Sequence, residues 1–288
     1  ETYAIKLLDP LKAKGDKRRR FKNEIQFGIR NAHKNIILIK DYGLYGESPF
    51  YVMPLYKSTL RKLMSVDIPS QKALQYFTQL LDGVQAAHLL EVNHRDLKPE
   101  NVLYDPATDC LVVADFGIAQ FNQEELYTLV ETGAADRLAN FQYAAPEQRH
   151  RGQPIDHRAD IYALGLMLNE LFTHEIPLGS GHKTIAAVAA ECAYLDELVE
   201  KMRQQDPNAR SSSIGQVKNE LIARGHDFVI QQRLSSLKKT VVPEREIDDP
   251  LINDPIQLVE VDYDTDGQLI LVLSQPVNDE WSEALRNF

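Results

Sequence analysis

The chain has 288 residues, a formal net charge of −10 and 43% hydrophobic residues, enough apolar material for a sizeable core. No apolar run reaches the roughly 18 to 20 residues that cross a bilayer, so we expect no membrane segment in this chain. Its acidic balance disfavours nucleic acid as a partner. Cys110 and Cys192 lie far apart without further metal ligands nearby. We therefore expect neither a disulfide framework nor a zinc site, and a reducing, cytoplasmic setting.

The first quarter of the sequence predicts a small mixed lobe. Residues 2–8 form a β-rich run that ends at Asp9-Pro10, residues 16–32 have helical periodicity, and 36–39 and 50–53 are strand-like. A strand needs paired neighbours, so the chain is expected to be N-terminally incomplete, with upstream strands outside it.

The remainder is predicted to be mainly helical up to residue 240, where the composition changes. Apolar spacing predicts helices over 71–90, 161–172 and 228–237, and the run over 161–172 is apolar enough for a buried helix. Beyond residue 240 the sequence holds 12 acidic and 2 basic residues, against 30 of each sign before it. The predicted division is a small lobe over 1–55, a helical lobe over 56–225, a helix with an acidic linker over 226–257, and the start of a further module over 258–288.

The last segment offers a choice between a hairpin and a calcium site. Asp262 to Gly267 matches the first half of a calcium-binding loop, but the twelfth position is Leu273, where a bidentate Glu belongs. Apolar residues alternate on both sides of Asp266-Gly267, a favoured hairpin turn. A hairpin is favoured, no metal is predicted in the tail, and a further helix is expected at 281–285.

Four ordered motifs carry the chemistry. The run His94-Arg95-Asp96-Leu97-Lys98-Pro99-Glu100-Asn101 is followed by Asp115-Phe116-Gly117 and Ala145-Pro146-Glu147, and Ala4-Ile5-Lys6 lies upstream in a strand. Each motif alone is more often a turn or loop element, but their joint order is not accidental. Over residues 1–225 the chain resembles the catalytic domain of eukaryotic-type (Hanks-type) Ser/Thr protein kinases. The resemblance implies an α+β, two-lobed protein kinase fold.

The resemblance also implies transfer of the γ-phosphoryl group of ATP to Ser or Thr hydroxyls of protein substrates. Asp96 is then the base that accepts or orients the hydroxyl proton. Asn101 and Asp115 are the expected ligands of Mg²⁺, which prefers oxygen donors. Lys98, two residues after Asp96, matches the Ser/Thr-specific form of the loop.

Lys6 is expected to contact the α- and β-phosphates and to be held by Glu24, which lies 18 residues downstream on the next predicted helix. Without the neighbouring motifs, Lys6 and Glu24 would be interpreted as a solvated ion pair that contributes about 0 to 1 kcal/mol to stability.

The adenine site is expected where the lobes join. Met53 corresponds to the gatekeeper, and the ring would bind the backbone carbonyl of Pro54 and the backbone N–H of Tyr56. Ala4 and Leu103 would sandwich it.

Supporting contacts are expected as well. The resemblance implies an ion pair between Glu147 and Arg210. It also implies that Asp160 anchors the catalytic loop.

Three features depart from the family pattern. No glycine-rich loop precedes Lys6, and Asn140 stands where the family usually has Thr. Gly28 stands four residues after Glu24, where an apolar residue is expected, and this predicts a mobile helix in the unactivated state.

The sequence allows more than one interpretation of how the protein is regulated and of what it does. Candidate phosphorylation sites are Tyr127, Thr128 and Thr132, and Arg95 would bind the phosphate group. For each of the three, an unmodified surface residue is an equally good interpretation. Autophosphorylation is expected, and self-association is one way to achieve it. The basic run at 17–20 is more often a solvated face than a docking site for that phosphate or the acidic tail. The rivals are a pseudokinase scaffold that acts through its C-terminal module and a small-molecule phosphotransferase of related fold.

Overall fold

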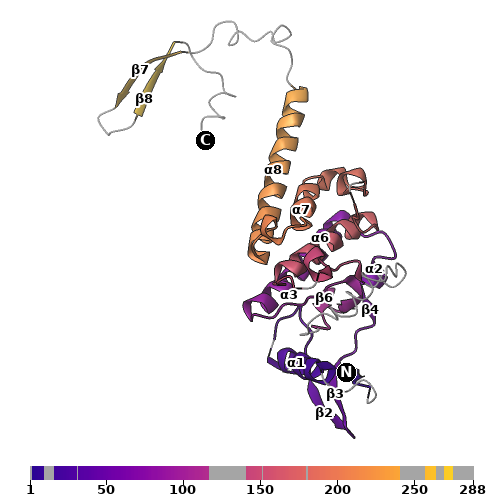
Figure 1. Cartoon of the computed structure of the whole chain (residues 1–288). Coiled ribbons are helices and arrows are strands. Elements are labelled where there is room, and N and C mark those ends of the chain that lie inside the picture. Colours follow the sequence, from indigo (N-terminus) through magenta and orange to yellow (C-terminus); the bar gives the residue numbers. More distant parts are fainter. Residues whose placement is uncertain are drawn as a thin grey trace. The chain divides into compact units, whose positions relative to one another are not determined.

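The computed structural model describes the chain in eight stretches. They are residues 2–9, 16–30, 32–116, 141–150, 152–179, 181–240, 257–263 and 269–274. The chain divides into two compact units, Glu1–Val229 and Ile230–Phe288 (Figure 1). Among the described residues no helix is both long and apolar enough to cross a membrane, and Cys110 and Cys192 are free thiols.

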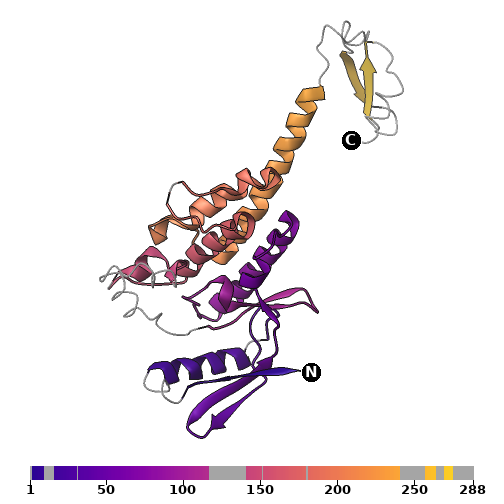
Figure 2. The same cartoon turned by 90° about the vertical axis from the view of Figure 1, so that its right-hand side faces the viewer.

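The small lobe is a three-stranded antiparallel sheet with one helix beside it (Figure 2). Its strands are β1 (Tyr3–Leu7), β2 (Asp41–Tyr45) and β3 (Ser48–Pro54), in the order β1-β3-β2. Helix α1 spans Asp16–Arg30. The small core between helix and sheet consists of Phe21, Ile25, Ile39 and Tyr51.

The prediction of a strand over residues 36–39 is wrong. These residues make only an isolated bridge between Ile36 and Val113 of the large lobe. The backbone N–H of Ile37 donates to Val113 (2.9 Å) and that of Ile39 to Gly28 on α1 (3.2 Å), so the segment is buried between elements instead of joining the sheet.

Gly28 permits a close approach between α1 and the segment that follows it. A Cβ at this position would lie 2.7 Å from Cδ1 of Ile39, closer than real Cβ contacts come. Ile39 therefore occupies the space that a side chain on α1 would fill. The predicted mobility of this helix stays a prediction.

We expect Gly28→Ala to destabilise the protein by about 1 to 3 kcal/mol through overpacking, although alanine is the better helix former. Urea unfolding measures the difference. Gly215→Ala is the matched control, because a Cβ there meets nothing closer than 3.4 Å. Equal effects of the two substitutions would contradict the packing argument.

The large lobe places a second sheet against helices. Its strands β4 (Ser58–Thr59), β5 (Val102–Asp105) and β6 (Cys110–Val113) run antiparallel in that order. The helices are α2 (Leu60–Leu63), α3 (Ser70–Leu89), α6 (Arg158–Thr173) and α7 (Leu195–Met202). As its apolar sequence predicts, α6 is buried along nearly its whole length, so its polar side chains must find partners within the protein.

Helix α8 crosses both the predicted boundary near residue 225 and the division between the two units after Val229. It runs without interruption over Ile214–Thr240, so the predicted boundary between 225 and 226 falls inside a helix, and the helix expected over 228–237 is its C-terminal half. In the second unit, β7 (Leu258–Tyr263) pairs antiparallel with β8 (Leu269–Leu273), which is the predicted hairpin. The helix expected at 281–285 lies outside the described residues.

Candidate active site

Lys6 is the centre of a cluster of charged groups that meet between the two sheets. It projects from β1, and its Nζ donates to Oε1 of Glu24 on α1 at 3.0 Å. The same Nζ forms an ion pair with Oδ1 of Asp115, which follows β6. The three predicted residues, which come from three separate segments of the chain, therefore converge.

Burial and mutual charge determine how these groups titrate. Burial lowers the pKa of Lys6, but the attraction of Glu24 and Asp115 outweighs it, and the net shift is upward. Burial also raises the pKa of Glu24, an effect that the charge of Lys6 only partly offsets. Lys6 thus stays a cation whose position depends on two carboxylates.

Tyr51 is a member of this cluster that sequence inspection missed. Its hydroxyl donates to Oε1 of Glu24 at 2.8 Å, and its ring is buried beneath Lys6 Nζ, 5.5 Å from the ring centroid. A buried tyrosine usually has a polar partner, so a Tyr within an apolar strand was the available signal.

The catalytic-loop residues are tied to one another. Asn101 Nδ2 donates to the backbone oxygen of Asp96 (2.8 Å) and to its Oδ2 (3.2 Å). Lys98 Nζ lies 3.0 Å from Oδ2 of Asp96. The backbone N–H of Ala114 donates to the carbonyl of Asn101 at 2.9 Å, which links this loop to the residue before Asp115.

Asp160 anchors the loop from α6, as predicted. Its carboxylate accepts from the backbone N–H of His94 (2.8 Å) and of Arg95 (2.7 Å), and it pairs with His88 Nε2 at 2.8 Å. Arg95 has a positive φ of 63°, an uncommon conformation for a non-glycine residue. The bonds to Asp160 hold the strained backbone that presents Asp96.

The Asp160 anchor predicts a dependence of stability on pH. Burial alone would raise the pKa of Asp160, but His88, His94 and the Arg95 N–H outweigh it and the pKa is lowered below its ordinary value of 3.8. A depressed pKa means that the stabilisation is fully present above about pH 4 and is lost as the pH falls through the folded-state pKa. We expect Asp160→Asn to have a flatter loss of stability below about pH 4, measured from urea midpoints. An unchanged slope would contradict this assignment.

Three rings connect the site to α1. The Phe116 ring packs between His94 (centroids 4.8 Å apart) and Phe27 on α1 (4.6 Å). His94 Nε2 is hydrogen-bonded to the carbonyl of Ala114 at 2.9 Å. Phe27, one residue before Gly28, thus makes the apolar contact that the sequence pattern assigned to the glycine position.

The residues predicted around adenine come from both sheets and from the segment after β3. Ala4 is the register partner of Met53, and the neighbouring Pro54 closes the same ladder opposite Tyr3. Met53, Tyr56 and Leu103 are partly buried against the large core. Their proposed contacts with a nucleotide remain predictions.

A second unforeseen network adjoins the catalytic loop. Arg61 donates to Glu100 (2.6 Å), to Glu170 on α6 (2.6 Å) and to the hydroxyl of Tyr143 (2.5 Å). Tyr143 also donates to Glu170. Arg61 and its three partners come from four separate segments, so no local pattern could have revealed the network.

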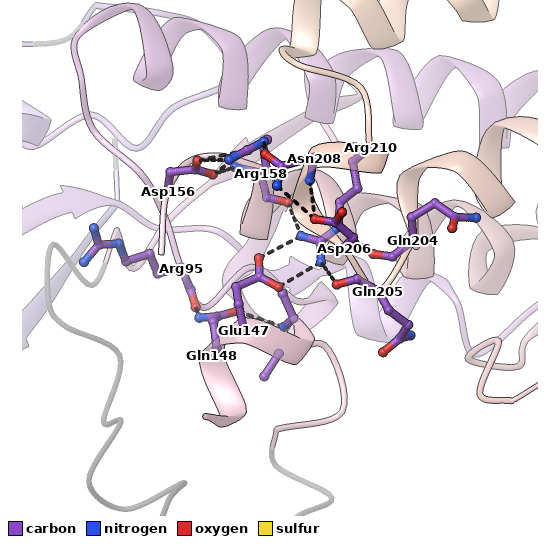
Figure 3. Close-up of polar contacts among 12 residues, drawn as sticks. Arg95, Glu147, Gln148, Asp156, Arg158, Gln204, Gln205, Asp206, Asn208 and Arg210 are labelled. Carbon is purple, nitrogen blue, oxygen red and sulfur yellow. Dashed lines mark hydrogen bonds and ion pairs between the residues drawn. The ribbon is translucent and has the colours of Figure 1, made fainter. Parts of the chain in front are cut away.

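Glu147 and Arg210 form the predicted buried ion pair (Figure 3). Both guanidinium terminal nitrogens donate to the carboxylate at 2.8 Å, and Nε donates to the carbonyl of Gln204. The adjacent Gln148 donates to the carbonyl of Arg95 at 2.8 Å. The Ala-Pro-Glu segment is thereby fixed to both the catalytic loop and the C-terminal helices. The expected sites Gly117, Tyr127, Thr128, Thr132 and Asn140 lie outside the described residues.

The fold and this site together define a protein kinase. The family model for the protein kinase domain matches residues 1–241, and the chain belongs to that family. Serine/threonine-protein kinase pkn3 of Myxococcus xanthus is 31% identical over 205 residues, which is 67% of this chain and 36% of that protein. PrkC of Bacillus subtilis is 35% identical over 162 residues, 55% of this chain and 24% of that protein.

A solved structure supports the same fold. The kinase domain of Mycobacterium tuberculosis PknI, in a double-mutant form, matches with a TM-score of 0.61 and 25% sequence identity. The match covers 77% of this chain and 85% of that one. The matches cover only 36% and 24% of the length of these two curated relatives.

Proposed function

We propose that this protein transfers the γ-phosphoryl group of Mg-ATP to Ser and Thr hydroxyls of protein substrates. The observation that carries the proposal is the convergence of Lys6, Glu24 and Asp115 through direct ion pairs, with Asp96 and Asn101 hydrogen-bonded to each other on the adjoining loop. Phosphoryl transfer depends chiefly on positioning and fixed charge, which such a constellation supplies.

Each residue then has a distinct part. Lys6, held by Glu24, offers a cation to the α- and β-phosphates. Asp96 accepts the proton of the attacking hydroxyl, and Lys98 beside it neutralises charge on the transferring group. The side chain of Asp96 is 41% exposed, so a substrate hydroxyl can reach it.

Asn101 and Asp115 fit Mg²⁺ through the chemistry of their donors. Asp115 provides a half-exposed carboxylate, and the Asn101 amide donates through nitrogen to Asp96, which leaves its oxygen for a cation. Bound Mg²⁺ would neutralise phosphate charge during transfer. Asp115 also pairs with Lys6, so the protein itself draws the cationic and metal-binding groups together.

The pseudokinase scaffold is the second candidate, and the presence of Lys6, Asp96, Asn101 and Asp115 in one connected site opposes it. We further propose protein substrates, self-association for autophosphorylation, and a cytoplasmic setting, the last in keeping with two free thiols.

The test is incubation with γ-labelled ATP, Mg²⁺ and a generic protein substrate, followed by phosphoamino-acid analysis. Label on phosphoserine and phosphothreonine that disappears with EDTA supports the proposal. Binding of ATP without any transfer, to the substrate or to the chain itself, would instead favour the scaffold.

A further inference from the structure

Tyr51 joins the small sheet to α1 at the place where Lys6 meets Glu24. It is the register partner of Lys6 in the ladder of β1 and β3, and residues directly opposite one another in such a ladder share one face of the sheet. Tyr51 is only 1% exposed, so its whole side chain lies within the lobe. The backbone of the sheet therefore fixes Lys6 and Tyr51 side by side.

The side chain of Tyr51 contacts α1 at two points. The centroid of its ring lies 5.3 Å from that of Phe21, and its hydroxyl donates to Oε1 of Glu24 at 2.8 Å. Phe21 and Glu24 are three residues apart, so they share one face of the helix. Two contacts on one face restrict both the distance of α1 from the sheet and the rotation of α1 about its own axis.

Glu24 is a buried carboxylate that is bound from two sides. Its Oε1 accepts from Tyr51 and, at 3.0 Å, from Lys6 Nζ, and its Oε2 lies 3.4 Å from the same Nζ. Among the described residues, Tyr51 and Lys6 are the two that donate to this carboxylate. A buried acceptor that loses its donors is strongly destabilising. If Lys6 moves, the hydroxyl of Tyr51 is the donor that remains.

Lys6 Nζ has more than one anionic partner. It pairs with Glu24 and with Asp115, and the proposed function adds the phosphates of ATP. These anions lie in different directions from Nζ, so the bond between Lys6 and Glu24 fixes α1 less firmly once Lys6 also binds phosphate. The hydroxyl of Tyr51, in contrast, donates to Glu24 alone among the described residues.

We propose that Tyr51 is a positioning residue for phosphoryl transfer. It holds Glu24, and through Glu24 the helix α1, independently of Lys6. Glu24 thus stays in place to orient Lys6 while Lys6 binds phosphate. A phenol suits this part because its ring packs in the apolar core and only its hydroxyl is polar. The nucleotide step rests on the proposed function, whereas the anchoring of α1 does not.

Hydrogen exchange of the whole chain without nucleotide tests the anchoring. In a Lys6→Met background, Tyr51→Phe removes the remaining donor to Glu24. It should speed exchange of α1 amides by about tenfold or more, the size expected when a buried acceptor loses its partner. Amides of α3 in the large lobe are the internal reference and should change less than about twofold. Tyr42→Phe is the matched control, because Tyr42 is the register partner of Tyr51 on β2 and is 59% exposed.

The exchange experiment has one supporting outcome, which is faster exchange in α1 with α3 unchanged. Unchanged exchange in α1 overturns the anchor, because the ring contact with Phe21, which Tyr51→Phe retains, would then hold the helix. An equal change in α1 and α3 overturns it too, since the variant would have lost overall stability. So does an equal effect of Tyr42→Phe.

Steady-state phosphate transfer tests the effect on Lys6. In the otherwise wild-type chain, we expect Tyr51→Phe to raise the KM for ATP by about three- to tenfold and to change kcat less than about twofold. Lys6 contacts the α- and β-phosphates before and during transfer, so a poorly held Lys6 weakens both states alike. A fall in kcat at unchanged KM, or no change in either, contradicts the positioning role. Faster α1 exchange in a chain that transfers no phosphate leaves the anchor standing and refutes the kinase proposal alone.

Discussion

Asp96→Asn is expected to reduce kcat by about 10² to 10⁴, because the loss of a positioned base costs that much in proton-transfer reactions. Asparagine keeps the shape of the side chain and an oxygen that accepts from Asn101 and Lys98, whose bonds to Asp96 are 3.2 and 3.0 Å long. What it removes is the capacity to take up a proton. The KM for ATP should stay within about twofold, since Lys6 and Asp115 are untouched.

The measurement is steady-state phosphate transfer to a generic protein substrate at saturating Mg-ATP. Asp67→Asn makes the same change at an exposed carboxylate whose partner is His174, remote from the catalytic loop in the chain, and should leave kcat unaltered. If Asp96→Asn retained more than about a tenth of the wild-type rate, Asp96 would not be the base.

The catalytic residues could be predicted because their identities and order are tightly constrained. Asp96, Asn101 and Asp115 lie in short motifs, and the pairing of Lys6 with Glu24 followed from a strand and the helix after it. Tyr51 could not be assigned in the same way, because an apolar strand does not reveal which polar group will lie beneath it. Its role emerges only when β3 packs under α1.

Errors in the predicted elements arose where tertiary contacts override local pattern. Residues 36–39 look like a strand because they are apolar, yet their backbone groups bond to α1 and β6. The true strand β2 is largely exposed, so it lacks the buried alternation that identifies strands. The kinase-like portion was expected to end near Gly225, but α8 continues through this residue. Glycine ends helices through a positive φ, and the described glycines with positive φ are Gly46, Gly152 and Gly179.

Glu147→Ala is expected to destabilise the protein by about 3 to 5 kcal/mol, because it leaves a buried guanidinium without its counter-ion. The side chain of Arg210 is 0% exposed and that of Glu147 is 6% exposed. Backbone carbonyls of Gln204 and Arg158 accept from Arg210 and the Tyr162 ring lies 4.9 Å away, but none of these carries a full negative charge.

The neighbouring pair Asp156–Arg158 provides the contrast within one region (Figure 3). Its carboxylate is 43% exposed, so Asp156→Ala should cost only about 0 to 1 kcal/mol. Urea unfolding of both variants gives the two values, and similar losses would mean that burial does not set the strength of these pairs.

Replacing Glu147 and Arg210 together by Met should cost less than Glu147→Ala alone, since no unpaired charge remains. Because Gln148 beside Glu147 bonds to the carbonyl of Arg95, the single variant should also lose phosphate transfer under conditions in which it is still folded.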